Sequence, residues 1–118
     1  MNEVVYRGLI YNDGKMIVLR ETVSPDGVVI ASEELRHIKK HSTSFAWGYG
    51  GSGPADLALS IVSDVLGYDP ESMAYQQFKW DKIVSLPQNG PWKITRAEVI
   101  EWDNDLNGRG KDNVREIG

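Results

Sequence analysis

The segment from Phe45 to Leu59, FAWGYGGSGPADLAL, constrains the fold of this chain more than any other stretch. It places four glycines within six positions and then runs directly into an apolar, helix-forming sequence. Glycine loses much backbone entropy on folding, so dense glycine indicates positive φ angles or close approach of another group. A glycine loop that ends at a helix start also presents unpaired backbone N–H groups, as anion-binding loops do. The segment therefore predicts either a tightly packed turn or a binding site.

A central helix is predicted over 54–66, immediately after the glycines. Pro54 suits the first helical turn, where the N–H that proline lacks is not needed. Gly67 suits the position just past the end, where a left-handed residue closes a helix. Apolar side chains recur at helical spacing along one broad face: Leu57, Ala58, Ile61, Val62, Val65 and Leu66. We expect this helix to be buried on most sides.

Composition limits the classes of protein that this chain can represent. Its 118 residues are 41% hydrophobic, which predicts one domain with a substantial core. The formal net charge of -4 argues against binding to nucleic acid through phosphate neutralisation. The absence of cysteine excludes disulfides and thiol chemistry. Since no apolar run approaches the roughly 18 residues of a membrane span, we expect a cytoplasmic protein without a membrane partner.

A β-hairpin is predicted over residues 3–22, where two runs of β-branched and aromatic residues flank Asn12-Asp13-Gly14. A second turn signal, Ser24-Pro25-Asp26-Gly27, precedes a short third strand over 28–30. The segment 32–41 begins with acidic residues and ends with basic ones, which predicts a short helix. A strand continuing from Val28 is the competing interpretation.

Two further helices are predicted in the C-terminal half. Asp69 and Pro70 open one that runs to about Val84, and the proline-rich stretch 86–91 ends it. A capping box from Thr95 to Glu98 opens a last helix of about ten residues. Residues 108–118 are polar and glycine-punctuated, which predicts a flexible tail. The predicted fold is thus a single α+β domain over 1–107, with an N-terminal hairpin or small antiparallel sheet against about three helices.

The glycines match the dinucleotide-binding pattern G-x-G-x-x-G at Gly48, Gly50 and Gly53. That pattern has meaning only inside a parallel βαβ unit, and the segment after the predicted helix is helical rather than a strand. A Walker-type loop is excluded because no Gly-Lys-Ser/Thr follows the glycines. We therefore do not expect a Rossmann or P-loop site.

A less specific anion site remains compatible with the loop. The backbone N–H groups of Gly50, Gly51, Ser52, Gly53 and Ala55 precede or open the helix, and the Ser52 hydroxyl lies among them. The rings of Trp47 and Tyr49 would stack on a base or another ring. The alternative is that the glycines let the loop pack under the central helix, with both aromatic rings in the core.

No persuasive catalytic or metal-binding set is found in the sequence. His37 and His41 have the i, i+4 spacing of one helix face, but no third ligand lies at a fixed offset, so we expect solvated histidines. Ser52 lacks an oriented base. Asp56 and Asp64 are expected on the solvated side of the central helix. We therefore expect a protein that is not an enzyme and carries no metal or cofactor.

Three tryptophans, Trp80, Trp92 and Trp102, are expected to anchor the core or an interface rather than to contact a cofactor. A chain of this size with four Trp often buries some of them against a second copy. This composition favours a homo-oligomer.

Three motifs together resemble a known family. They are the segment Phe45–Leu59, the stretch Tyr75-Gln76-Gln77-Phe78-Lys79, and Leu86-Pro87 followed by Trp92–Thr95 and Glu98–Ile100. Over residues 4–103 the chain resembles a domain of unknown function found in bacterial, archaeal, phage and mobile-element genomes. The resemblance implies a shared fold and a role centred on the glycine motif, without supplying an activity.

Two functions from different classes follow as expectations. The first is a non-enzymatic binding protein that holds a phosphate-bearing small molecule, such as a nucleotide or a nucleotide-derived signal, with Lys79 and Arg7 as nearby cations. The distribution of the family makes a phage-encoded sponge that acts against host defence one instance of this function. The second is a phage or mobile-element protein that inhibits or adapts a host protein by direct contact, with the glycine motif purely structural.

Overall fold

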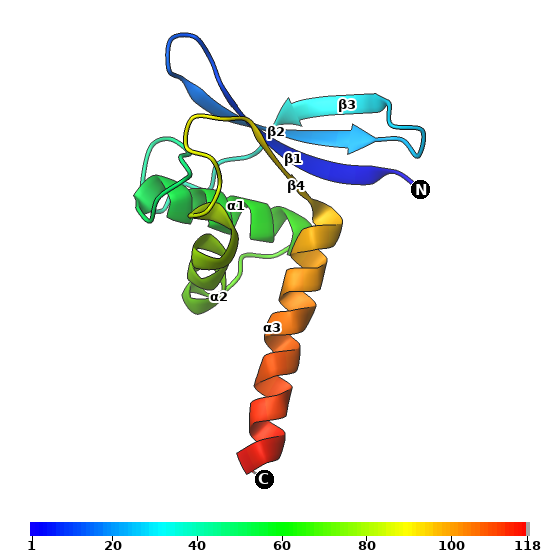
Figure 1. Ribbon diagram of the computed structural model, residues 1–118, viewed down its shortest axis with the longest axis vertical. Coiled ribbons are helices and arrows are strands. Elements are labelled where there is room, and N and C mark those ends of the chain that lie inside the picture. Colours follow the sequence, from blue (N-terminus) through cyan, green and yellow to red (C-terminus); the bar gives the residue numbers. More distant parts are fainter. Residues whose placement is uncertain (118) are drawn as a thin grey trace.

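A computed structural model describes the backbone of residues 1–117 and the side chains of residues 1–107. Its four strands form one antiparallel sheet in the order β3-β2-β1-β4, and the helices gather on one side of that sheet (Figure 1). The elements are β1 (Glu3–Ile10), β2 (Met16–Val23), β3 (Val29–Glu34), α1 (Ser52–Leu66), α2 (Ser72–Phe78), the π-helical turn η1 (Lys79–Ile83), β4 (Trp92–Thr95) and α3 (Arg96–Ile117). The predicted α+β class is confirmed.

The predicted N-terminal hairpin is confirmed over β1 and β2. The two strands pair from Glu3 opposite Val23 to Ile10 opposite Met16. Gly14 closes the connection with a φ of 85°, a left-handed conformation that glycine adopts without steric cost. The alternation along β1 buries Tyr6 on the face toward the helices and leaves Arg7 on the other face.

The helix predicted over 32–41 is wrong. Residues 32–34 instead extend β3, which pairs with β2 as the edge strand of the sheet, as the competing interpretation held. Arg20 lies opposite Glu33 and pairs with its carboxylate at 3.6 Å, so the acidic residues find a partner across the strands. The N–H of Leu35 then donates to the carbonyl of Val18, which continues the pairing beyond β3.

Strand β4 was not predicted, because it has only four residues and follows a proline-rich stretch. It pairs with β1, and its Trp92 indole lies so close over Gly8 that an added Cβ would come within 2.1 Å of the ring. The capping box after it is confirmed, since the Glu98 N–H donates to Thr95 Oγ1 at 3.1 Å. The helix α3 is longer than the ten residues predicted, because it runs to Ile117 and includes residues 108–117, over which a flexible tail was predicted.

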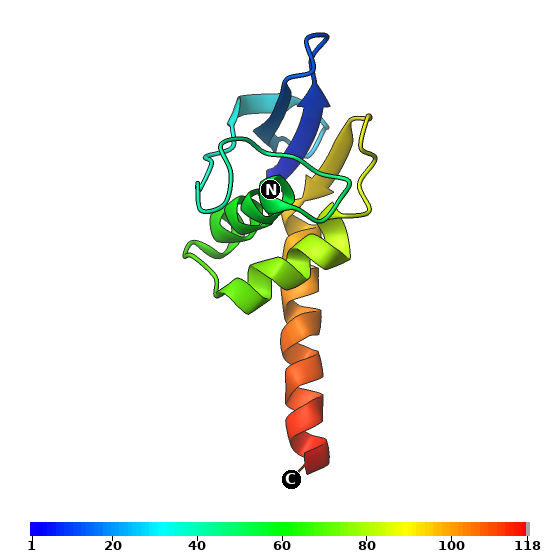
Figure 2. The same ribbon diagram turned by 90° about the vertical axis from the view of Figure 1, so that its left-hand side faces the viewer.

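The core lies between the sheet and α1, and α3 leads away from it on the same side (Figure 2). The predicted central helix is confirmed, and Gly67 ends it with a φ of 81° and an N–H that donates to the Ser63 carbonyl. Its Asp64 accepts hydrogen bonds from Tyr6 Oη at 2.5 Å and Arg20 Nε at 2.7 Å, and is therefore not merely solvated. No described helix combines the length and the apolar character needed to span a bilayer.

Candidate functional site

The glycines at the two ends of the loop are explained by packing. Gly48 has a φ of 83°, and an added Cβ would come within 2.9 Å of the Gln88 backbone. An added Cβ at Gly53 would come within 2.8 Å of the Ala46 side chain. Contacts this short do not occur with a real Cβ, so both positions require glycine for close approach of the chain.

The middle of the loop is covered by two aromatic rings. A Cβ at Gly50 would meet the Trp80 ring at 2.6 Å, and a Cβ at Gly51 would meet the Tyr49 ring at 2.6 Å. Both rings remain open to solvent, with Trp80 58% and Tyr49 45% exposed. The solvent-facing side of the loop is therefore formed by two aromatic rings, Tyr49 of the loop and Trp80 of η1, rather than by exposed backbone N–H groups.

The start of α1 offers fewer free amides than the sequence predicts. Gly51 is the N-cap residue, and the Ala55 N–H already donates to its carbonyl at 3.0 Å. Pro54 has no N–H, and Gly53 is buried. Ser52, the first helical residue, is exposed. A site made of backbone groups alone at this helix start would therefore have few free N–H groups to donate to an anion.

Two predicted site residues lie away from the exposed surface of the loop. Trp47 is fully buried and packs edge-on against Trp92, with ring centroids 5.3 Å apart, so its ring has no free face for stacking. Arg7 lies on the sheet face opposite the helices, where its Nε pairs with Glu21 at 3.4 Å. Neither residue joins Tyr49 and Gly50 in a common surface.

Lys79, in contrast, lies beside the loop. Lys79 is the first residue of η1, and its carbonyl accepts the π-helical hydrogen bond from the Val84 N–H. At the other end of this turn, the carbonyl of Ile83 accepts a hydrogen bond from the Gly48 N–H of the loop. The Lys79 ammonium lies 4.5 Å from the centroid of the Trp80 ring, the same ring that covers Gly50. We call Tyr49, Gly50, Lys79 and Trp80 the aromatic platform.

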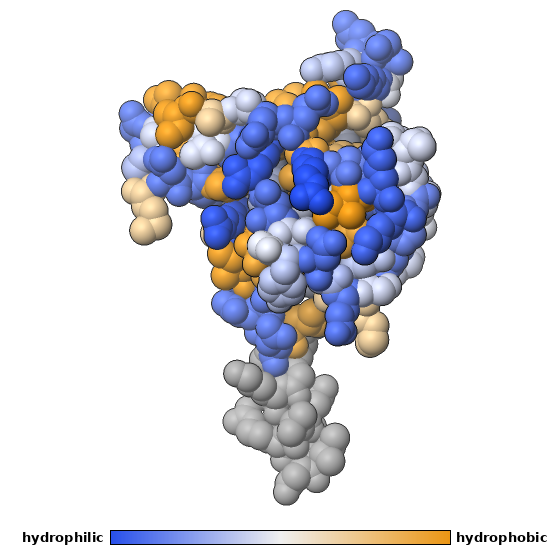
Figure 3. Space-filling model, turned by 180° about the vertical axis from the view of Figure 1, so that it is seen from behind, coloured by the Kyte–Doolittle hydropathy of each residue, from blue (hydrophilic) through white to orange (hydrophobic). Residues whose placement is uncertain are grey.

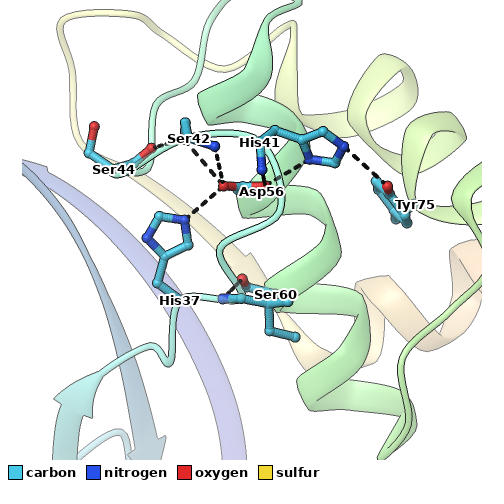
Figure 4. Close-up of polar contacts among 8 residues, drawn as sticks. His37, His41, Ser42, Ser44, Asp56, Ser60 and Tyr75 are labelled. Atoms are coloured by element: carbon cyan, nitrogen blue, oxygen red, sulfur yellow. Dashed lines mark hydrogen bonds and ion pairs between the residues drawn. The ribbon is translucent and has the colours of Figure 1, made fainter.

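A second polar cluster surrounds Asp56 and was not predicted (Figure 4). Asp56 is fully buried rather than solvated. Its carboxylate accepts hydrogen bonds from His37 Nε2 at 2.9 Å and His41 Nδ1 at 2.8 Å. The backbone N–H groups of His41 and Ser42 add two more, at 3.0 and 2.9 Å. The expectation of solvated histidines is wrong for His37, which is half-buried, whereas His41 is exposed; both rings bond to a carboxylate that comes from α1.

Hydrogen bonding fixes the electrostatics of this cluster. Burial raises the pKa of the Asp56 carboxyl, but the bonds from His37, Ser42 and His41 outweigh it, so the pKa lies below its ordinary value. His41 Nδ1 donates to Asp56, and the Nε2 atom of the same ring faces the Tyr75 hydroxyl at 3.5 Å. This arrangement orients the His41 ring and ties the chain before the loop to α1.

The only hint of this cluster in the sequence was the i, i+4 spacing of His37 and His41. Their shared partner Asp56 lies 19 residues from His37 and 15 residues from His41, separations that no helical or strand period reveals. Within the described residues, no group of three or more His, Asp or Glu side chains has the geometry to hold a metal ion. The cluster is therefore an ion-pair and hydrogen-bond network.

The fold and the site define a small single-domain α+β protein with an exposed aromatic platform beside a glycine loop. The model of a family of unknown function, DUF6166, matches residues 6–105, and the chain belongs to this family. No curated protein and no solved structure matches the chain.

Proposed function

We propose that this protein binds a phosphate-bearing small molecule, such as a nucleotide or a nucleotide-derived signal, at the aromatic platform, without chemical turnover. The observation that carries the proposal is Lys79, which is only 8% exposed. None of the described carboxylates lies within ion-pair distance of its ammonium. The Lys79 ammonium is not among the buried polar atoms without a partner, so it reaches the surface beside Trp80, where a bound phosphate would serve as its counter-ion.

The neighbouring rings supply the second half of such a site. Trp80 and Tyr49 are large aromatic side chains that remain about half exposed, and base–aromatic stacking is worth about 1–3 kcal/mol per base. The Lys79 ammonium already lies over the Trp80 ring, so a ring stacked on this tryptophan would bring its phosphate close to the cation. We propose the capture of a nucleotide signal during phage–host conflict as the biological role.

Titration calorimetry with pyrophosphate, ATP and a panel of cyclic nucleotides tests the proposal. We expect at least one of these compounds to bind, and Lys79→Met to weaken that binding tenfold or more, about 1.4 kcal/mol. The control is Lys82→Met, which removes a half-buried lysine from the same π-helical turn. Unchanged affinity in Lys79→Met, or no binding across the panel, would refute the proposal, provided that circular dichroism shows an intact fold.

A second candidate function is binding of a host protein at the edge strand β3. Val28, Val29 and Ile30 are 54%, 47% and 56% exposed, and Figure 3 shows apolar side chains at the upper left, where β3 lies. An edge strand offers unpaired backbone groups to an added strand. The packing contacts of the loop glycines favour this candidate too, because they explain the motif without a ligand.

Substitutions at the two surfaces distinguish the two candidates. If a host protein binds β3, Ile30→Asp should abolish its capture in a pull-down, whereas Lys79→Met should leave it unchanged. The reverse pattern, with capture lost only in Lys79→Met, would contradict binding at β3. Gly51→Ala serves as a matched variant within the glycine loop, because its added methyl group crowds only the exposed Tyr49 ring.

A further inference from the structure

The sheet has one face that no described helix covers. All described helices lie on the side of the sheet that carries Tyr6 and Val18 (Figure 1). The opposite face, which we call the outer face, carries apolar residues from the two central strands: Val5, Leu9, Ile17 and Leu19. A groove of about 320 Å³ lies on it beside Arg7 and Lys93. Val5 and Ile17 are already buried, whereas Leu9 and Leu19 are half-buried, and a sheet usually covers such side chains with another layer.

The strand register places four residues in one row across the outer face. Glu34 of β3 lies opposite Leu19, Leu19 lies opposite Arg7, and Arg7 lies opposite Lys93 of β4. The row therefore begins with an acidic side chain at one edge of the sheet and ends with a basic one at the other edge. Arg7 has Glu21 as its partner at 3.4 Å.

The two charges at the ends of this row are exposed and have no ion-pair partner among the described residues. Three strand spacings, about 14 Å, separate Glu34 from Lys93, so they cannot pair within one chain. Arg7 also lies directly opposite Lys93, and the Glu21 carboxylate beside Arg7 offsets these like charges on its side of the pair only.

We propose that the outer face binds the outer face of a second copy of this chain, related by a two-fold axis parallel to the strands. Such an axis reverses the row, so that Glu34 of each copy faces Lys93 of the other and Leu19 faces Arg7. The self-complementary contact has the isologous form of a closed dimer, and it packs the strands of the two sheets in an aligned manner. The proposal is independent of the ligand site, since it uses the opposite side of the sheet.

Charge reversal tests the arrangement by sedimentation velocity over a range of protein concentrations. The wild type should dimerise, and both Glu34→Lys and Lys93→Glu should raise the dissociation constant tenfold or more. The double variant should regain an affinity within about threefold of the wild type. An equimolar mixture of the two single variants should form a heterodimer, visible by native mass spectrometry, because each contact again joins opposite charges.

The controls are Lys40→Glu and Glu101→Lys, which make the same charge changes at exposed positions off the outer face and should leave dimerisation unchanged. A monomeric wild type at every concentration would overturn the proposal. So would a double variant as weak as the single ones. A dimer that responds to Glu34→Lys but not to Lys93→Glu would also overturn it, and would indicate pairing along the edge of β3. Nucleotide binding, measured in the same variants, should stay unchanged.

Discussion

Asp56 is the residue on which polar contacts from residues 37–42 converge. It lies near the start of α1 and accepts five hydrogen bonds, three from side chains and two from backbone N–H groups. These bonds hold a connector that has no regular secondary structure against the central helix. A carboxylate with this many donors is well compensated for its burial, and loss of its charge would leave donors facing one another.

Asp56→Asn should therefore lower the free energy of unfolding by roughly 3 kcal/mol, the scale of breaking a buried ionic network. Because the folded-state pKa of Asp56 is lowered, the stabilisation is complete above the ordinary aspartate pKa of about 3.9 and is lost as the pH falls through the lower folded-state value. Urea unfolding from pH 7 to pH 3 should show the difference between wild type and variant shrinking on acidification.

The exposed Asp105→Asn is the control, with an expected change within about 0.5 kcal/mol. A variant as stable as the wild type at pH 7 would show that the network is not needed for the fold. A difference that persists unchanged at pH 3 would show that the charge of Asp56 is not its source.

The site residues show what local sequence does and does not reveal. Lys79 lies beside the loop through the Trp80 ring that it shares with Gly50, and its role toward a ligand stays a prediction. Trp47 is fully buried, as the packing alternative held, whereas Trp80, expected to anchor the core or an interface, is exposed over Gly50. Residue type alone does not separate the two, since indole rings serve equally in cores and on surfaces. Their burial depends on tertiary packing that no local pattern records.

At the scale of elements, the capping box of α3 contributes a separable amount of stability. Thr95 Oγ1 accepts the Glu98 N–H at 3.1 Å and donates to the Glu98 carboxylate at 3.2 Å. Thr95→Val keeps the β-branched shape that suits β4 and removes the hydroxyl. We expect it to lower the free energy of unfolding by about 1 kcal/mol, measured by urea denaturation.

Thr95→Ser retains the hydroxyl and should stay within a few tenths of a kcal/mol of the wild type. Equal losses in the two variants would assign the effect to the strand rather than to the cap. Equal stability of Thr95→Val and wild type would show that the cap contributes nothing.

Elements with strong local signals were predicted well, and the edge strands were not. The hairpin and α1 carry their turn and cap residues within the element, so the pattern identifies them. The charge pattern of 32–41 favoured a helix, but cross-strand contacts of Glu33 decided for β3. Strand β4 depends on its pairing with β1, and a four-residue strand has no period of its own. Tertiary context overrode local preference at both edges.

For the molecule as a whole, the glycine segment connects the two layers. Because Gly50 and Gly53 lack a side chain, Trp80 and Ala46 can approach them closely. The loop is also hydrogen-bonded to η1, since the Gly48 N–H donates to the Ile83 carbonyl. The sequence indicated that this segment was central and left open whether it binds or packs. Two of the close contacts, those of Gly50 with Trp80 and of Gly48 with Gln88, come from residues 30 or more positions further along the chain, where no local pattern reveals them.

The hydrogen bonds to Asp56 have a consequence for amide hydrogen exchange. The amides of His41 and Ser42 lie in an irregular connector, where exchange is normally fast, yet both point at a buried carboxylate. Their protection is thus governed by one side chain rather than by a helix or a strand. In NMR spectra, the hydrogen-exchange rates of these two amides would therefore report whether the chain before the glycine loop is attached to α1 or released from it.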